Sequence, residues 1–151
     1  MKKTADVHLL LIEDDDVDAM DIERGFRKNR IANPIIRAID GQQAKELLTT
    51  GQVPAPFLIM MDIKMPRMDG HEFLRWLRDD PTYQDSIVFV LTTSHNDRDI
   101  NKCYKHNIAG YFIKSETGKG FLDVVNLLDG FWKIVQFPFP KATSDPEEVP
   151  S

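Results

Sequence analysis

The sequence predicts an α/β protein with a doubly wound, five-stranded parallel sheet and five helices, on the basis of three observations. Five short apolar runs alternate with longer segments of helical spacing along the 151 residues, so strands and helices follow one another in turn. The first, third and fourth runs are nearly continuous, as in strands buried on both faces of a parallel sheet. The chain is short for this class, which favours the flavodoxin-like strand order 2-1-3-4-5 with right-handed crossovers.

The predicted elements follow one another without an internal repeat. Strands are expected at the apolar runs, which are residues 7–12, 34–39, 57–61, 87–91 and 110–113. Helices are expected where apolar residues recur every three or four positions, at about 17–29, 41–50, 70–79, 97–107 and 118–136. Asp40 and Gln43 have the spacing of a capping box at the start of the second helix, although Asp40-Gly41 also reads as a turn.

Composition and charge narrow the class of protein. A chain of 151 residues with 42% hydrophobic content fits one soluble domain with its own core. The formal net charge of −5 argues against a nucleic-acid-binding surface. The apolar run Leu9–Ile12 is too short for a signal peptide or a membrane span. Cys103 is the single cysteine and cannot form an internal disulfide, so we expect a buried, inert thiol in a cytoplasmic protein.

The C-terminal part of the chain differs from the rest. We expect a folded domain at residues 1–136 and a C-terminal extension at 137–151. The extension begins Phe-Pro-Phe-Pro, which excludes a helix and predicts an extended arm. The last eight or so residues are polar and acidic, which predicts disorder. Because the extension is short, we expect no attached DNA-binding or enzymatic domain.

Polar residues stand at the ends of the predicted strands, where ligands bind in open parallel sheets. They are Glu13–Asp16, Asp62, Thr92–Ser94 and Lys114. Converging carboxylates repel unless a cation binds them, and a few hard oxygen ligands suit Mg²⁺. Each residue alone has a plainer explanation, such as a helix cap for the aspartates. The set at the correct strand ends predicts phosphoryl transfer to an aspartate.

Four segments resemble the signature regions of response-regulator receiver domains. They are Leu10–Asp15, Met61–Gly70, Val90–Ser94 and Gly110–Lys114. The pattern Asp-x-x-Met-Pro-x-Met-Asp-Gly in the second segment is highly specific. The resemblance covers about residues 7–136, nearly all of the expected folded chain.

The resemblance implies a role for individual residues. Asp62 matches the phosphoacceptor, while Glu13 and Asp14 match the acidic pair. Together with Asp62 and the backbone carbonyl of Lys64, this pair would bind Mg²⁺, with Asp14 the direct ligand. Thr92 and Lys114 would hold the phosphoryl oxygens. Thr92 and Tyr111, the rotating aromatic residue, would form the switch that reports phosphorylation.

A narrower resemblance concerns the partner. The Leu91–Ser94 stretch, the Lys114-Ser115 pair and the Phe131-Trp132 pair are similar to single-domain regulators that partner bacterial and cyanobacterial phytochromes. The resemblance therefore implies a sensor histidine kinase as partner, and specifically a phytochrome. Most receivers have proline where Ser115 stands, after a bond that is typically cis. A cis bond before serine is costly, so either the bond is trans here or the loop retains a cis bond.

The last predicted helix carries apolar residues on more than one face. One stripe is Phe121, Val124, Val125, Leu128, Trp132 and Val135, and a second set is Leu122, Leu127, Phe131 and Ile134. A helix on one side of a sheet needs only one stripe, although a wide stripe lying deep against the sheet is an alternative. We expect the surplus face to form a homodimer interface with Phe131, Trp132, Phe137 and Phe139.

The sequence as a whole predicts a two-component response regulator rather than an enzyme. A histidine kinase would phosphorylate Asp62, the protein would assist its own phosphorylation and dephosphorylation, and the output would be protein contact. One alternative is a phosphorylation-independent binding module with the same fold. The other is an aspartyl-phosphate phosphohydrolase of the haloacid dehalogenase type, which would need an acid where Lys64 stands. We expect no partnership with nucleic acid or membrane.

Overall fold

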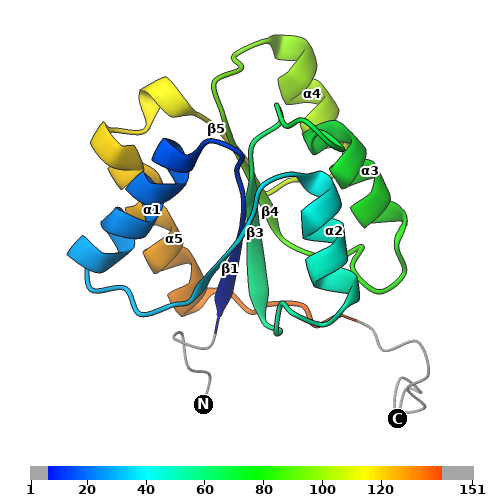
Figure 1. The fold of residues 1–151 in the computed structure, drawn as a ribbon, viewed down its shortest axis with the longest axis horizontal. Helices are drawn as coiled ribbons and strands as arrows, with labels where there is room; N and C mark the ends of the chain where they lie inside the picture. Colours follow the sequence, from blue (N-terminus) through cyan, green and yellow to red (C-terminus); the bar gives the residue numbers. More distant parts are fainter. Residues whose placement is uncertain (1–6, 141–151) are drawn as a thin grey trace.

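The structure is a computed structural model that describes residues 7–140. Its five parallel strands form one sheet in the order β2-β1-β3-β4-β5, which confirms the predicted fold class (Figure 1). The strands are β1 (His8–Ile12), β2 (Ile35–Ala38), β3 (Phe57–Met61), β4 (Val88–Thr92) and β5 (Gly110–Ile113). No helix within 7–140 is long and apolar enough to cross a membrane.

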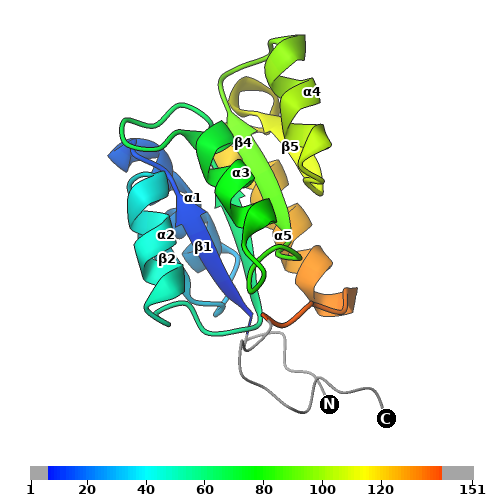
Figure 2. The same ribbon diagram turned by 90° about the vertical axis from the view of Figure 1, so that its right-hand side faces the viewer.

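Five helices cover the two faces of the sheet. They are α1 (Asp16–Lys28), α2 (Gly41–Thr49), α3 (Gly70–Asp79), α4 (Asp97–Lys105) and α5 (Leu122–Ile134). Helices α1 and α5 lie on one face, and α2, α3 and α4 lie on the other (Figures 1 and 2). The result is three layers with a separate hydrophobic core on each side of the sheet.

The central strands are apolar on both faces because each face meets a layer of helices. Ile59 and Met61 of β3 pack into the core under α2 and α3, while Leu58 and Met60 pack into the core under α1 and α5. Every residue of β3 and of β4 is buried. This arrangement explains why these runs read as continuous rather than alternating.

Strand register brings the ends of four strands to one level. Ile12 pairs with Met61, and Thr92 pairs with Ile113. The next residues along these strands are Glu13, Asp62 and Lys114. Because the strands are parallel, all of these polar side chains emerge at the same edge of the sheet, which we call the carboxyl-end edge.

The last helix begins later than expected. The predicted start near residue 118 is wrong, because α5 begins at Leu122 after a 3₁₀ turn at Lys119–Phe121. Gly120 and Phe121 adopt left-handed φ angles of 63° and 59°, which no α-helix can contain. The apolar spacing of Phe121 therefore reflects its burial in the core and not membership of the helix.

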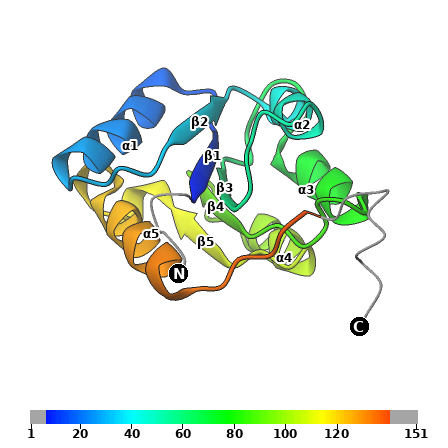
Figure 3. The ribbon, with the colours of Figure 1, turned by 90° about the horizontal axis from the view of Figure 1, so that it is seen from below.

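The arm Phe137–Pro140 packs on its own domain. It crosses beneath the sheet at the amino ends of the strands (Figure 3). Phe137 is buried with its ring 6.0 Å from that of Phe131, and residues 138–140 lie beside Phe57 and Ser86. The expectation that the arm is free for a second subunit is therefore wrong for Phe137. The acidic stretch expected to be disordered lies outside the described residues.

The prediction that Trp132 lies in a dimer interface is also wrong. It is fully buried, with its ring 5.8 Å from that of Phe26, because it belongs to the stripe that faces the sheet. Phe131 is half-buried against Phe89, and Phe139 is 64% exposed. The surplus face of α5 is real, since its other apolar side chains are exposed: Leu122, Leu127 and Ile134.

Candidate functional site

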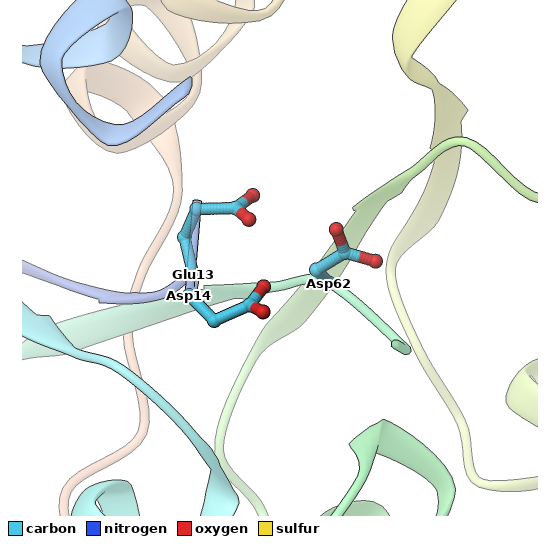
Figure 4. Close-up of side chains that lie close together, drawn as sticks. All are labelled: Glu13, Asp14 and Asp62. Atoms are coloured by element: carbon cyan, nitrogen blue, oxygen red, sulfur yellow. The ribbon is translucent and has the colours of Figure 1, made fainter. Parts of the chain in front are cut away.

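Three carboxylates meet at the carboxyl-end edge. Glu13 and Asp14 follow β1, Asp62 follows β3, and the nearest oxygens of all three lie within 4.8 Å of one another. The side chains of Glu13 and Asp14 point toward Asp62 (Figure 4). Glu13 and Asp62 are buried, while Asp14 is exposed to solvent. This convergence was predicted from the residues that follow the apolar strands in the sequence.

Lys114 supplies the positive charge of the site. Its Nζ lies 2.8 Å from Asp62 Oδ2 and 3.0 Å from Glu13 Oε1, and only 9% of its side chain is exposed. A third carboxylate, Asp18 in the first turn of α1, lies 2.7 Å from the same nitrogen. Asp18 was not among the site residues predicted from the sequence. The available signal was its position in a helix whose first turn must face the same edge as Glu13.

The charges of the site shift two pKa values. Burial, with help from the charge of Asp62, raises the pKa of Glu13 from 4.5 to about 7 despite the proximity of Lys114. Burial alone would lower the pKa of Lys114, but hydrogen bonds to Asp18 and Asp62 raise it above its usual range. Lys114 therefore stays charged, yet its charge is shared among three carboxylates and does not neutralise the pocket.

The donor set fits a hard divalent cation. Three carboxylates provide oxygen ligands, and the exposure of Asp14 leaves room for coordinated water. Lys64 lies on the same open surface as Asp14, and its backbone N–H donates to Asp62 Oδ1 over 3.1 Å. The carbonyl of Lys64 as a further ligand stays a prediction.

The loop that carries Lys64 is attached to the neighbouring loop after β2. Arg67 Nε donates to Asp40 Oδ2 over 2.9 Å, and the N–H of Gly41 donates to the carbonyl of Met68 over 3.1 Å. A Cβ on Gly41 would lie 2.3 Å from that carbonyl oxygen, so only glycine fits. Asp40 also caps α2 by accepting from the N–H of Gln43. The capping box is incomplete, because the Gln43 side chain accepts from Ile39 instead.

Thr92 and Tyr111 are linked through Ser94. Thr92 is fully buried, and its Oγ1 accepts a 3.4 Å contact from the N–H of Ser94. The Tyr111 hydroxyl donates to the carbonyl of Ser94 over 2.8 Å. Ser94 Oγ donates to Asp99 in α4 over 2.6 Å, and Asp99 pairs with His71 of α3 at 3.0 Å. The predicted switch pair therefore joins a hydrogen-bonded network that reaches two helices.

Comparison with known proteins identifies the family. The model of the response regulator receiver domain matches residues 9–126. The chain belongs to this receiver family. Response regulator Rcp1 of Synechocystis sp. is 31% identical over 128 residues, covering 82% of this chain and 87% of that protein.

Solved structures of receiver proteins have the same fold as this chain. The crystal structure of Rcp1 in its Mn²⁺-bound form has a TM-score of 0.77 at 30% identity, covering 87% of this chain and 98% of that one. The phosphorylated cyanobacterial phytochrome response regulator RcpA has a TM-score of 0.78 at 27% identity, covering 87% and 97%. This receiver is therefore a two-component response regulator with the flavodoxin-like fold.

The sequence left open whether the Lys114–Ser115 bond is cis or trans. The cis peptide bond in the described part of the chain precedes Pro56, so the Lys114–Ser115 bond is trans. Lys114–Glu116 form a 3₁₀ turn there. Cys103 is fully buried, as expected, and burial raises the pKa of its thiol to about 12, which disfavours the reactive thiolate.

Proposed function

We propose that a sensor histidine kinase phosphorylates Asp62 in the presence of Mg²⁺. The observation that supports this most strongly is the meeting of Lys114 with Asp62 inside a cluster of carboxylates. A buried lysine 2.8 Å from a carboxylate that also lies beside two further acids is arranged for a dianionic group and a cation together. Glu13, Asp14, Asp62 and the Lys64 carbonyl would hold the metal.

In the proposed reaction, a carboxylate oxygen of Asp62 attacks the phosphorus of a phosphohistidine. The P–N bond breaks, the imidazole leaves with its electron pair, and an acyl phosphate forms. The N–H of Lys64 orients the attacking carboxylate through Oδ1. Lys114 and Thr92 donate hydrogen bonds to the phosphoryl oxygens. When bound, the metal supplies positive charge beside those oxygens.

The switch would follow from the same contacts. A phosphoryl oxygen that draws the Thr92 hydroxyl toward Asp62 competes with its 3.4 Å contact to Ser94. Since Ser94 also holds Tyr111 and Asp99, its displacement would release both the aromatic ring and the first turn of α4. The protein would also assist its own dephosphorylation through these groups.

The proposed partner is a cytoplasmic phytochrome kinase. The similarity to RcpA supports this partner, since RcpA is a cyanobacterial phytochrome response regulator and the similarity covers 87% of this chain. The broader proposal of a histidine kinase does not depend on that detail.

Homodimerisation is proposed through the exposed face of α5. Leu127 and Ile134 lie on that face, Ile134 is 81% exposed, and Phe139 follows on the arm. Ile134→Glu should therefore shift the protein toward monomer in sedimentation experiments, with Gln136→Glu, at an exposed position just after the helix, as the control for one added negative charge. A wild-type protein that is monomeric at micromolar concentration, with and without phosphorylation, would contradict this part of the proposal.

Labelling with a small phosphodonor tests the central claim. Asp62→Asn should abolish phosphorylation by acetyl phosphate and Mg²⁺, as measured by intact mass, because the nucleophilic carboxylate is lost. Asp85→Asn is the matched control, because Asp85 is exposed at the opposite edge of the sheet beside Phe57. Normal labelling of Asp62→Asn would remove the proposal, and absence of label on the wild type would favour a phosphorylation-independent binding module.

A further inference from the structure

Asp18 places an additional carboxylate on the lysine of the phosphorylation site. Its Oδ2 lies 2.7 Å from Lys114 Nζ, the shortest of the three carboxylate contacts to that nitrogen. The first turn of α1 is fixed by a cap, since Asp15 accepts from the N–H of Asp18 over 3.0 Å. The neighbouring acids of α1 have other partners: Asp16 pairs with Arg37, and Asp21 pairs with Arg24. Asp18 is therefore the residue of α1 that holds Lys114.

The other two partners of Lys114 have a second task. The Lys114 ammonium donates hydrogen bonds to Asp18 and Asp62, and Glu13 forms an ion pair with the same nitrogen at 3.0 Å. Glu13 and Asp62 also belong to the carboxylate cluster that fits a metal, whereas Asp18 does not. Metal binding and phosphorylation both draw on the oxygens of Glu13 and Asp62. The contact with Asp18 is the one that neither event removes.

We propose that Asp18 is a positioning residue that keeps the Lys114 ammonium over Asp62 while metal and phosphoryl group are bound; this inference rests on the proposed function. Lysine carries its charge on a flexible four-carbon chain with little preferred direction. Once its other partners turn to the metal and to phosphorus, a lysine without a tether samples positions away from the transferring group. Asp18 fixes Nζ from the first turn of α1.

Loss of Asp18 should have two effects, one that slows phosphorylation and one that favours binding of the anionic donor. Misplacement of Lys114 lowers the maximal rate of phosphorylation, because charge stabilisation of the transferring group depends on placement within about 1 Å. Removal of a negative charge beside the pocket also reduces repulsion of an anionic donor, so the donor concentration at half-maximal rate should stay the same or fall. A misfolded fraction would also lower the maximal rate at unchanged half-saturation, so the rate is expressed per folded molecule, and recovery of the rate by Asp18→Glu distinguishes positioning from loss of structure.

The experiment measures the initial rate of phosphorylation against acetyl phosphate concentration, with Mg²⁺ saturating and the full chain as it stands. Asp18→Asn should lower the maximal rate by roughly tenfold, with half-saturation unchanged or lower. Asp18→Glu, which retains the charge, should recover most of the rate. Asp21→Asn is the matched control, because it removes an acid from the same helix that pairs with the exposed Arg24, and it should behave as wild type.

The outcomes separate this inference from the proposed function. If the wild type is labelled on Asp62 and Asp18→Asn shows the wild-type rate, the positioning role is refuted while the phosphorylation site stands. A higher maximal rate in Asp18→Asn would mean that Asp18 restrains Lys114 rather than places it, and would also overturn the inference. If the wild type itself takes no label on Asp62, the proposed function fails first.

Discussion

The carboxyl-end edge of the sheet and the packed layer of α1, α5 and the arm differ in what they bury. At the edge, Glu13, Asp62 and Lys114 are removed from water, and burial together with neighbouring charge raises the pKa of Glu13 to about 7. On the α1–α5 side, the buried groups are aromatic and aliphatic, with Phe26 and Trp132 packed edge to face.

This difference indicates where the molecule obtains its stability. Buried like charges oppose folding, whereas each large apolar side chain removed from water favours it by roughly 1.5–3 kcal/mol. The chemical site is therefore held in place by apolar packing beneath the strand ends, whose buried side chains lie outside the carboxylate cluster. Changes in the two regions should affect different measurements.

The largest expected effect is on the packed side. Trp132→Ala should lower the free energy of unfolding by about 3–5 kcal/mol, because the indole is fully buried and its removal leaves a cavity. Trp132→Phe should cost less, since the indole Nε1 is buried without a hydrogen-bond partner among residues 7–140 and its loss costs nothing in hydrogen bonding.

Denaturant titration of both variants measures this effect, and phosphorylation per folded molecule should match the wild type. A Trp132→Ala protein of wild-type stability would mean that this layer does not support the site. A variant that stays folded yet takes up no phosphoryl group would break the separation between the two regions.

The sequence predicted the edge better than the packed side, for a physical reason. Strand ends in a parallel sheet share one level, so the positions of Asp62 and Lys114 follow from counting along apolar runs. The orientation of Trp132 depends on how α5 lies against the sheet. Because α5 has apolar residues on two faces, the sequence did not show which face packs against the sheet. The left-handed turn at Gly120 and Phe121 was hidden, because Phe121 continues the apolar spacing of the helix that follows. Asp18 could be placed only by knowing which way the first turn of α1 faces.

A smaller effect is expected on the edge when metal is absent. Burial raises the pKa of Glu13 from 4.5, its ordinary value, to about 7 in the folded protein. Between these pH values, the folded protein retains a proton that the unfolded chain releases, so the free energy of unfolding falls as pH rises. The fall should approach about 3 kcal/mol by the time the pH exceeds 7.

Glu13→Gln tests this dependence in EDTA, with free energies of unfolding measured from pH 5 to pH 8. The variant should lack the decline and should exceed the wild type in stability at pH 8. Asp16→Asn serves as the control, because its carboxylate is exposed and pairs with Arg37 outside the cluster. If wild type and Glu13→Gln have parallel pH profiles, burial of this carboxylate is not a cost to the fold.

The smallest expected effect concerns Asp14, the exposed member of the cluster. Because Asp14 is open to solvent, Asp14→Ala should leave the stability of the metal-free protein nearly unchanged. It should nevertheless weaken Mg²⁺ binding by at least about tenfold, or roughly 1.4 kcal/mol, since a cation that keeps several waters depends on each of its few carboxylates. Calorimetric titration measures the affinity, and Mg²⁺ should stabilise the variant less than the wild type by the same amount.

Asp16→Ala should bind Mg²⁺ as the wild type does, because Asp16 lies outside the three-carboxylate cluster. Equal Mg²⁺ affinity in Asp14→Ala and the wild type would show that the metal is held by the buried carboxylates alone. The need of the carboxyl-end edge for a cation, which the packed layer of α1 and α5 does not share, would then rest on Glu13 and Asp62.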